Sequence, residues 1–293
     1  MKFKAIEDNI RLDNFLCSNI DTSRSQITKM IKNHEVLVNG NDVKAGYMLK
    51  VGDEIVVNHE DESMDVVAEK MDLDIVYEDD DVLVVNKANG IVVHPAPGNY
   101  TGTLVNGLLY HSNLSDTNGE FRPGIVHRID AYTTGLLMVA KNNKAHEILA
   151  KELSEKKTYR KYVALVWGVI KEDTGVIDAP IGRSDNDRKK QAINPKGKEA
   201  ITHFKVLKRF KKATLIELTL ETGRTHQIRV HMDYIGHPVV NDPVYGRRKI
   251  IDNTGQCLHA KELGFVHPTT GKYMQFDSKL PDAFLNILKQ FEE

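Results

Sequence analysis

Apolar residues recur at helical spacing near the start of the chain and at strand spacing beyond it. Within residues 11–32 they form two short helical groups, separated by a Ser/Thr-rich stretch at 22–25 that suits helix capping. An Asn-Gly pair between apolar residues at 36–43 predicts a hairpin, and residues 51–57 predict a further strand. Two helices and a small sheet therefore predict a first domain over residues 1–58.

The composition changes abruptly after this unit. We interpret residues 59–72 as a solvated linker, because acidic side chains dominate there. Farther along, strand-like runs such as 82–87 and 90–94 alternate with Gly, Pro and Asp turns, and residues 142–156 predict a helix. Residues 73–293 are predicted to form a second, larger domain.

The total charge of the chain, taken alone, argues against a nucleic-acid partner. The chain has 293 residues, with 40 Lys and Arg against 41 Asp and Glu and a formal net charge of −1. Proteins that neutralise phosphates usually carry a net positive charge. Residues 60–81, however, hold eleven acidic residues against one lysine, whereas residues 183–212 hold eleven basic residues against three acidic ones. Near-neutrality is therefore an average over an acidic linker and a basic body, and it does not exclude RNA.

Other classes are excluded more firmly. No apolar run approaches the roughly 18 residues that a membrane span needs, and the start of the chain has no apolar stretch of signal-peptide length. We therefore expect a cytoplasmic protein with no membrane partner. Cys17 and Cys257 lie in no CxxC pair, so neither a disulfide framework nor a Cys-based zinc site is indicated.

The segment 122–142 carries the strongest candidate chemistry. We interpret it as an apolar strand that approaches a polar turn, followed by a second apolar strand that leaves it. This arrangement places the carboxylate of Asp130 beside His127 and Arg128 on a loop between buried strands. Taken alone, such an Asp before Thr-Thr-Gly would more often bond turn amides with its side chain.

The wider sequence favours a functional role. HRID at 127–130, followed by TTGLLMVAK, resembles the active-site motif of the RluA family of pseudouridine synthases. Further segments resemble other family motifs in the expected order, and they lie at 87–99 with 103–111, 160–168, 220–246 and 258–268. The resemblance implies an α+β catalytic domain with mixed, mainly antiparallel sheets flanked by helices. It also implies isomerisation of uridine to pseudouridine without a cofactor or metal.

The resemblance assigns three catalytic residues. Asp130 is implied as the carboxylate that acts near the ribose and Arg229 as its cationic partner. Tyr162 is implied as the ring that contacts the target base and as a candidate for handling the C5 proton. Without the motifs, Arg229 would be interpreted as a surface arginine and Tyr162 as a packing residue. The segment 223–236 predicts a helix capped by Thr225.

On that predicted helix, Ile228, Met232 and Ile235 share one apolar face, and Gly236 ends it. Arg229 lies off this apolar face, so we expect it to point toward a cleft.

Further residues are implied to bind substrate. Arg128 resembles the family arginine that occupies the position vacated by the flipped base, although a structural ion pair with Asp130 is the alternative. The remaining candidates on the catalytic domain are His127, Arg224, His226 and Gln227.

A metal site is not expected. Several histidines have irregular spacing and no accompanying Cys, so we expect structural or RNA-facing roles for His226, His231, His237, His259 and His267. We interpret residues 79–81 as a hairpin turn, since they lack the spaced oxygen ligands of a calcium loop.

The sequence also departs from the family motifs at several positions. Ala131-Tyr132 replaces a pair that is often Lys-Asp, and places a bulky ring next to Asp130. Thr134 stands where Ser is common, Ala88 where Pro is usual, and Asn241 where Gly is usual. None of these departures removes the Asp, Tyr or Arg that the chemistry requires.

The first domain resembles the S4 RNA-binding domain. This resemblance implies that basic side chains contact the RNA backbone, namely Arg11, Arg24, Lys29 and Lys32. An S4 unit fused to this catalytic domain is typical of synthases that modify ribosomal RNA, notably the D type acting on the large subunit. We therefore expect a large-subunit RNA substrate and a monomer without an obligate protein partner. The alternatives are a non-catalytic RNA-binding ribosome-assembly factor of the same fold and a synthase that acts on tRNA.

Overall fold

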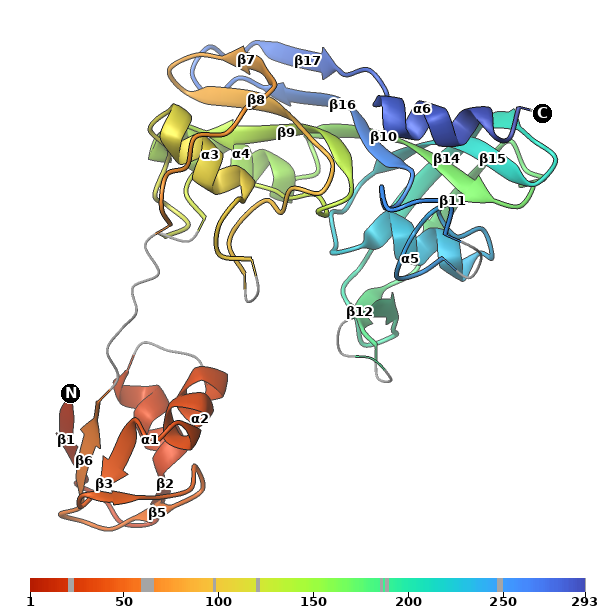
Figure 1. Cartoon of the computed structure of the whole chain (residues 1–293). Helices are drawn as coiled ribbons and strands as arrows, with labels where there is room; N and C mark the ends of the chain where they lie inside the picture. Colours follow the sequence, from red (N-terminus) through yellow and green to blue (C-terminus); the bar gives the residue numbers. More distant parts are fainter. Residues whose placement is uncertain are drawn as a thin grey trace. The chain divides into compact units, whose positions relative to one another are not determined.

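The chain divides into two compact units, Met1–Met64 and Asp65–Glu293 (Figure 1). The computed structural model describes residues 1–20, 24–58, 66–96, 99–119, 122–184, 187, 190–246 and 250–292. Parts of three sequence predictions lie outside these residues, namely 22–23 of the predicted cap, 59–65 of the predicted linker, and Arg188 and Lys189 of the basic segment. The proposed boundaries at 58 and 73 remain predictions.

The first unit has the predicted order of two helices and a small sheet. Its helices are α1 (Leu12–Asn19) and α2 (Arg24–Lys32). One sheet has the order β1-β6-β3-β4 and β2 pairs with β5, the strands being β1 (Lys2–Lys4), β2 (Ile10–Arg11), β3 (Val36–Val38), β4 (Asn41–Asp42), β5 (Met48–Leu49) and β6 (Glu54–Val57).

The predicted hairpin of this unit joins β3 and β4. Its turn residues Asn39 and Gly40 both have positive φ, 51° and 79°, which are the values that a two-residue hairpin turn requires. Leu16 of α1 and Ile27 of α2 are fully buried in one apolar core with Ile55 of β6. The amphipathic pattern of residues 11–32 thus positions both helices against the sheet.

The second unit is built on a nine-stranded mixed sheet. Its order is β11-β14-β15-β10-β16-β9-β8-β7, with β17 also paired to β16. Among the described strands, only β16 and β9 run parallel. The strands are β7 (Ile75–Glu78), β8 (Val82–Lys87), β9 (Thr134–Ala140), β10 (Tyr159–Trp167), β11 (Thr174–Asp178), β14 (Ile201–Arg209), β15 (Ala213–Leu220), β16 (Leu258–Val266) and β17 (Tyr273–Asp277). A separate hairpin pairs β12 (Ile181–Arg183) with β13 (Gln191–Ile193).

Helices cover both faces of the large sheet. They are α3 (Leu104–His111), α4 (Asn143–Ser154), α5 (Gln227–Tyr234) and α6 (Asp282–Lys289). Leu137 and Val139 of β9 pack in one core with α3 and α5, whereas Leu136 and Met138 pack in another with α4. Successive side chains of a strand point to opposite faces, so both sides of β9 are apolar. The predicted α+β class with mixed, mainly antiparallel sheets is confirmed.

Two predicted strands are wrong. Residues 90–94 form no strand, because the carbonyl oxygens of Val92 and Val93 accept the first amides of α3 instead of joining a ladder. Before Asp130, only an isolated bridge joins Ile125 to Val139, and Gly124 has a φ of 69° that interrupts an extended chain. Among the helices of the described residues, none is long and apolar enough to cross a membrane.

Candidate active site

Asp130 lies on a loop anchored to the centre of the large sheet. The loop leads into β9, where Gly135 has a φ of 109° and approaches the Ala260 backbone so closely that a Cβ would overlap it. Thr134 Oγ1 lies 2.8 Å from Nδ1 of His259 on β16. The TTG of the motif therefore fixes where β9 begins and, with it, the position of Asp130.

The Asp130 side chain does not close its own turn. Its backbone carbonyl accepts the amide of Thr133 at 3.0 Å, whereas its carboxylate reaches across to Arg229. Arg229 Nη1 donates to Asp130 Oδ2 at 2.9 Å, and the Asp130 side chain is 17% exposed. The bond to Arg229 thus replaces the turn-amide role that an isolated Asp would more often have.

Arg229 is held from two sides. Its Nε and Nη2 donate to the two carboxylate oxygens of Asp242 at 2.7 and 2.8 Å. Burial opposes the positive charge, but the two carboxylates outweigh it and raise the pKa of Arg229. Asp242 is fully buried, and Arg229 keeps its pKa below the usual range despite that burial. The guanidinium is therefore a fixed cation against Asp130.

Arg229 lies on α5, whose start differs from the prediction. Thr225 does not cap the helix: the N-cap residue is His226, in the left-handed region with φ 57° and ψ 18°, and no side chain caps it. The apolar face is as predicted, with Ile228 and Met232 buried in the core. Gly236, with φ 82°, ends the helix.

Tyr162 extends from β10 into the same site. It is 7% exposed and packs in the core shared with α5. Burial raises the pKa of Tyr162; the Arg160 charge opposes this shift, and the Asp130 charge adds to it. The phenol is therefore protonated at neutral pH.

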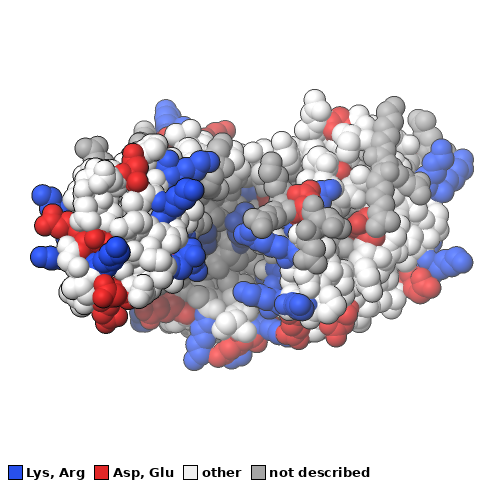
Figure 2. Space-filling model, turned by 90° about the horizontal axis from the view of Figure 1, so that it is seen from below, with Lys and Arg blue, Asp and Glu red and all other residues white. Residues whose placement is uncertain are grey.

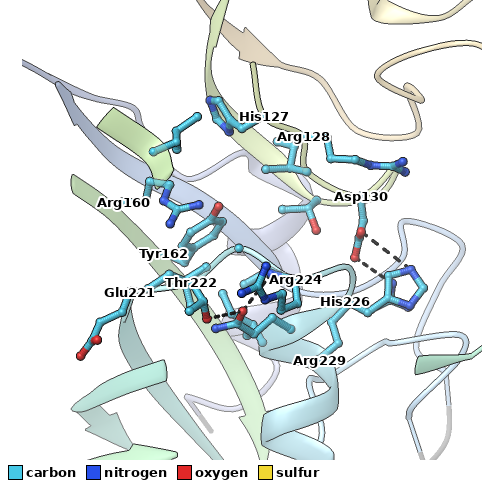
Figure 3. Close-up of a pocket in the computed structure, with 18 of the residues that line it drawn as sticks. His127, Arg128, Asp130, Arg160, Tyr162, Glu221, Thr222, Arg224, His226 and Arg229 are labelled. Atoms are coloured by element: carbon cyan, nitrogen blue, oxygen red, sulfur yellow. Dashed lines mark hydrogen bonds and ion pairs between the residues drawn. The ribbon is translucent and has the colours of Figure 1, made fainter. Parts of the chain in front are cut away.

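One cavity of about 370 Å³ brings together all eight of the site residues that the sequence predicts on this unit. They are His127, Arg128, Asp130, Tyr162, Arg224, His226, Gln227 and Arg229. In Figure 3 the Asp130 carboxylate points toward His226, and Glu221 points away from the labelled group. The lining combines a carboxylate, several cations and an aromatic ring, which suits an anionic ligand with a planar base.

Two of these residues are engaged by the protein itself. His127 Nε2 accepts the amide of Met138 at 3.1 Å, and burial lowers the pKa of His127 to about 3. Gln227 is buried; its Oε1 accepts from Thr222 and Arg224, and its Nε2 donates to Ile201 and Thr202. Both side chains therefore hold the pocket wall, and their implied RNA contacts stay predictions.

Arg128 is arranged differently. Its side chain is exposed, and its Nη1 lies 3.3 Å from Nε2 of the buried His94. Burial, with help from Arg128, lowers the pKa of His94 to about 4, so the ring is neutral and can accept this bond. Among the described residues, Asp130 pairs with Arg229 and lies near His226, and it forms no ion pair with Arg128.

Sequence reasoning missed several residues that shape this site. Lys87 is 1% exposed, and its ammonium donates to the carbonyls of Ala88, Ile91 and Ala131. It thereby fixes the residue that follows Asp130. The sequence signals were its place at the end of an apolar run and at the start of the motif segment 87–99. Asp242, Tyr245 and Arg160 were also missed, because the residues that they contact are not adjacent in the sequence. Arg160 also lines the cavity.

The departures from the family motifs are accommodated. The Tyr132 ring packs against Gly255 and lines a different, smaller cavity, so it does not line the Asp130 pocket. Asn241 has a φ of 62°, a conformation that Gly and Asn tolerate best. Its side chain also bonds Asp252 and the carbonyl of Gly255.

Two histidines outside the pocket, His231 and His259, have partners within the protein on both ring nitrogens. His231 lies between Thr202 and the Ala179 carbonyl, and His259 between Thr134 and Ser278.

Among the described residues, Asp79, Asp81 and His267 bring possible ligand atoms together. Asp79 accepts the amides of Asp81 and Val82, so these bonds close the hairpin turn between β7 and β8, as predicted.

The first unit presents basic side chains of its own. Arg11 and Arg24 both donate to Asp13, which is 4% exposed, while the arginines are 47% and 59% exposed. The bond from Arg11 is the largest influence that lowers the pKa of Asp13. Lys29 and Lys32 are exposed on α2. Figure 2 shows groups of Lys and Arg interspersed with Asp and Glu on the face that it draws.

Comparisons with known proteins agree with this geometry. A family model described as RNA pseudouridylate synthase matches residues 81–234, and one described as S4 domain matches residues 10–55. An uncharacterized RNA pseudouridine synthase of Bacillus subtilis is 56% identical, with 97% of this chain and 94% of that protein covered. Ribosomal large subunit pseudouridine synthase D of Pseudomonas aeruginosa is 44% identical, with 91% and 87% covered. The solved structure of human RNA pseudouridylate synthase domain containing 1 is 28% identical with a TM-score of 0.60, and 75% of this chain and 86% of that chain are covered.

Proposed function

The chain belongs to the RNA pseudouridylate synthase family, and from this premise we propose that it converts uridines of large-subunit ribosomal RNA into pseudouridine, with Asp130 as the catalytic carboxylate. The predicted family and the S4 domain are confirmed by the matches to both models. The enzyme is an RNA pseudouridine synthase, an isomerase. The observation that carries the role of Asp130 is its bond to the buried Arg229 inside a cavity that Tyr162 also lines.

The reaction rearranges atoms without adding or removing any. The C1′–N1 bond of a uridine breaks, the base turns, and a C1′–C5 bond forms. The proton on C5 leaves, and N1 gains one, so the product has the composition of the substrate. The reaction therefore needs a positioned carboxylate and a site that holds a base outside its stack.

Asp130 supplies the carboxylate. Three routes use it: attack on C1′, addition to the base, or removal of the C2′ proton. All three need the ionised form, and a neighbouring cation favours that form. Arg229 provides this cation at 2.9 Å and is itself fixed by Asp242.

Tyr162 and Arg128 receive the flipped nucleotide in this proposal. A base that leaves its stack loses stacking energy, and an aromatic ring offsets part of that loss. Burial raises the pKa of Tyr162, so its ring stacks on the base in the protonated form, with a hydroxyl that donates a hydrogen bond. Arg128, exposed and planar, enters the stem at the position that the uridine leaves.

The RNA substrate follows from a relative and from the first unit. The relative from Pseudomonas aeruginosa carries a name that specifies the ribosomal large subunit. Contact of the S4 unit with the RNA backbone is supported by its exposed basic side chains, Arg11, Arg24, Lys29 and Lys32. We propose further that the enzyme works in the cytoplasm as a monomer.

Site mapping tests the proposal. RNA from cells with and without the protein is treated with a carbodiimide that marks pseudouridine, and reverse-transcription stops are mapped. We expect stops in large-subunit ribosomal RNA that disappear without the protein and are not restored by Asp130→Asn. Stops that persist with Asp130→Asn would overturn the catalytic role.

The same experiment separates the alternatives. A ribosome-assembly factor without catalysis predicts that no stop depends on the protein. A synthase for tRNA predicts dependent stops in tRNA alone.

A further inference from the structure

His226 lies at an unusual point of the backbone. It is a non-glycine residue with φ 57° at the N-cap of α5, yet it offers the helix no side-chain cap. Such conformations carry a free-energy cost and often occur at functional sites. The His226 ring is instead directed into the cavity, where its Nε2 lies 3.8 Å from Asp130 Oδ1.

The other ring nitrogen contacts Tyr245. His226 Nδ1 lies 2.8 Å from the Tyr245 hydroxyl, and that hydroxyl accepts the backbone amide of Gln191 at 2.9 Å. Tyr245 is 8% exposed, and a buried hydroxyl that accepts one bond retains a proton to donate. The nitrogen that faces it is Nδ1.

This geometry fixes the tautomer of His226. If Tyr245 donates to Nδ1, the ring proton lies on Nε2 and points toward Asp130. The opposite tautomer would direct a nitrogen lone pair at a carboxylate oxygen, which is electrostatically unfavourable. Burial lowers the pKa of His226, and the charges that act on the ring are those of Asp130, Arg229, Asp242 and Arg128. The ring is therefore neutral, with a single proton to place.

Gln191 belongs to β13 of the separate hairpin. Its amide is not used in the pairing with β12, since it donates to Tyr245. Arg183, the last residue of β12, is paired with Gln191 and is exposed. Most of the hairpin lies within the basic segment 183–212. A continuous set of contacts thus runs from the hairpin through Tyr245 and His226 to Asp130.

We propose that His226 is a positioning residue for Asp130 and that Tyr245 ties its orientation to the β12–β13 hairpin. Arg229 holds Oδ2, and His226 holds Oδ1 once RNA seats the hairpin and closes the 3.8 Å gap. The carboxylate is then fixed at both oxygens only when RNA is bound. This inference rests on the proposed function, because it concerns the same carboxylate.

A pair of backbone variants tests the link from the hairpin. Gln191→Pro removes the amide proton that Tyr245 accepts, whereas Gln191→Ala keeps it. The substrate is an unmodified transcript of bacterial large-subunit ribosomal RNA. We expect the single-turnover rate to fall about tenfold for Q191P, with apparent affinity unchanged, and to stay at the wild-type value for Q191A. Equal rates for the two variants would overturn the link.

Tyr245→Phe provides a second variant that leaves the backbone intact. Its ring still packs over Arg229, whose Cζ lies 5.0 Å from the ring centre, and only the hydroxyl is lost. We expect a fall in rate similar to that of Q191P, again without a change in affinity. A wild-type rate for Y245F would contradict the proposal.

Nitrogen NMR of the full chain, labelled at histidine nitrogens, gives a readout that needs no activity. We expect a protonated Nε2 and an unprotonated Nδ1 for His226, with the Nδ1 signal shifted in Y245F. A proton on Nδ1 would overturn the proposal. If the wild-type protein forms no pseudouridine, the proposed function fails, and this measurement still decides the tautomer.

Discussion

Arg229 Nη1 donates to Asp130 Oδ2 across 2.9 Å, between residues 99 positions apart in the sequence. Nε and Nη2 of the same guanidinium donate to the buried carboxylate of Asp242. The planar guanidinium donates to both oxygens of Asp242 while its Nη1 reaches Asp130, and the compact ammonium of a lysine does not reproduce this geometry. The arrangement holds Oδ2 of Asp130 and favours its negative charge before substrate arrives.

We therefore expect Arg229→Lys to form pseudouridine about 100-fold more slowly, because a charge-assisted bond contributes roughly 1.5–3 kcal/mol. The measurement is the single-turnover rate on the unmodified large-subunit transcript. Asp130→Asn serves as the inactive reference. If R229K folds normally and retains the wild-type rate, Arg229 does not act on Asp130.

Lys87→Met should destabilise the second unit. The substitution leaves the carbonyls of Ala88, Ile91 and Ala131 without their ammonium donor, and each buried unpaired group costs about 1–3 kcal/mol. Urea unfolding followed by the fluorescence of Trp167, the single tryptophan, reports this unit.

Lys141→Met is the matched control for that substitution. Lys141 pairs with Glu78 near the surface, so its loss should cost at most about 1 kcal/mol. Equal losses in free energy of unfolding for K87M and K141M would show that the three carbonyls do not depend on Lys87.

The sequence predicted those parts of the fold that depend on short-range patterns. Asn39-Gly40 alone sufficed for a hairpin, because few other residue pairs adopt two positive φ values. Ile228 and Met232 marked the buried face of α5 by their spacing. For the site, a resemblance of motifs was needed, and the structure brings Asp130 and Arg229 together as that resemblance implied.

The missed features depend on contacts that are distant in sequence. Val92 and Val93 have strand-forming side chains, yet their carbonyl oxygens accept the first backbone amides of α3. No local sequence pattern reveals these bonds. Thr225 is a residue type that often caps helices, but α5 begins one residue later. Its N-cap is His226, whose left-handed backbone aims the ring into the cavity. Lys87 could not be interpreted without knowing that the loop after Asp130 returns to it.

Gly135→Ala should disrupt the start of β9. Its φ of 109° disfavours any side chain, and a Cβ would also overlap the Ala260 backbone, so the parallel pairing with β16 must shift. Gly90→Ala is the control, because Gly90 has a φ of 78° but open space around it, and it should cost only about 1 kcal/mol. We expect G135A to lower the urea midpoint far more than G90A; similar midpoints would contradict this account of the TTG motif.

Stability should fall as the pH drops below about 6.5. Burial lowers the pKa of His127 to about 3 and that of both His94 and His259 to about 4, from a usual value of 6.5. Between these values the unfolded chain binds more protons than the folded one, so the stabilisation present above pH 6.5 is lost toward pH 4. Each histidine contributes a slope of about 1.4 kcal/mol per pH unit.

His127→Gln isolates one of these histidines. Gln keeps an acceptor for the Met138 amide but does not titrate. We expect the slope of unfolding free energy against pH, measured by urea unfolding between pH 6 and 4.5, to fall by about one third of the slope that these histidines contribute. An unchanged slope would show that His127 binds a proton equally in both states.

The arginines of the first unit should determine part of the salt dependence of RNA binding. Arg11 and Arg24 converge on the buried Asp13, which holds both side chains in place while leaving them about half exposed. A side chain that neutralises a phosphate releases counterions, so removing it reduces the slope of log affinity against log salt by about 1. We expect Arg11→Ala and Arg24→Ala each to weaken binding of the large-subunit transcript and to reduce that slope, while Lys2→Ala, an exposed lysine on β1, leaves both unchanged. A slope that stays at the wild-type value in R11A and R24A would remove both arginines from the RNA interface.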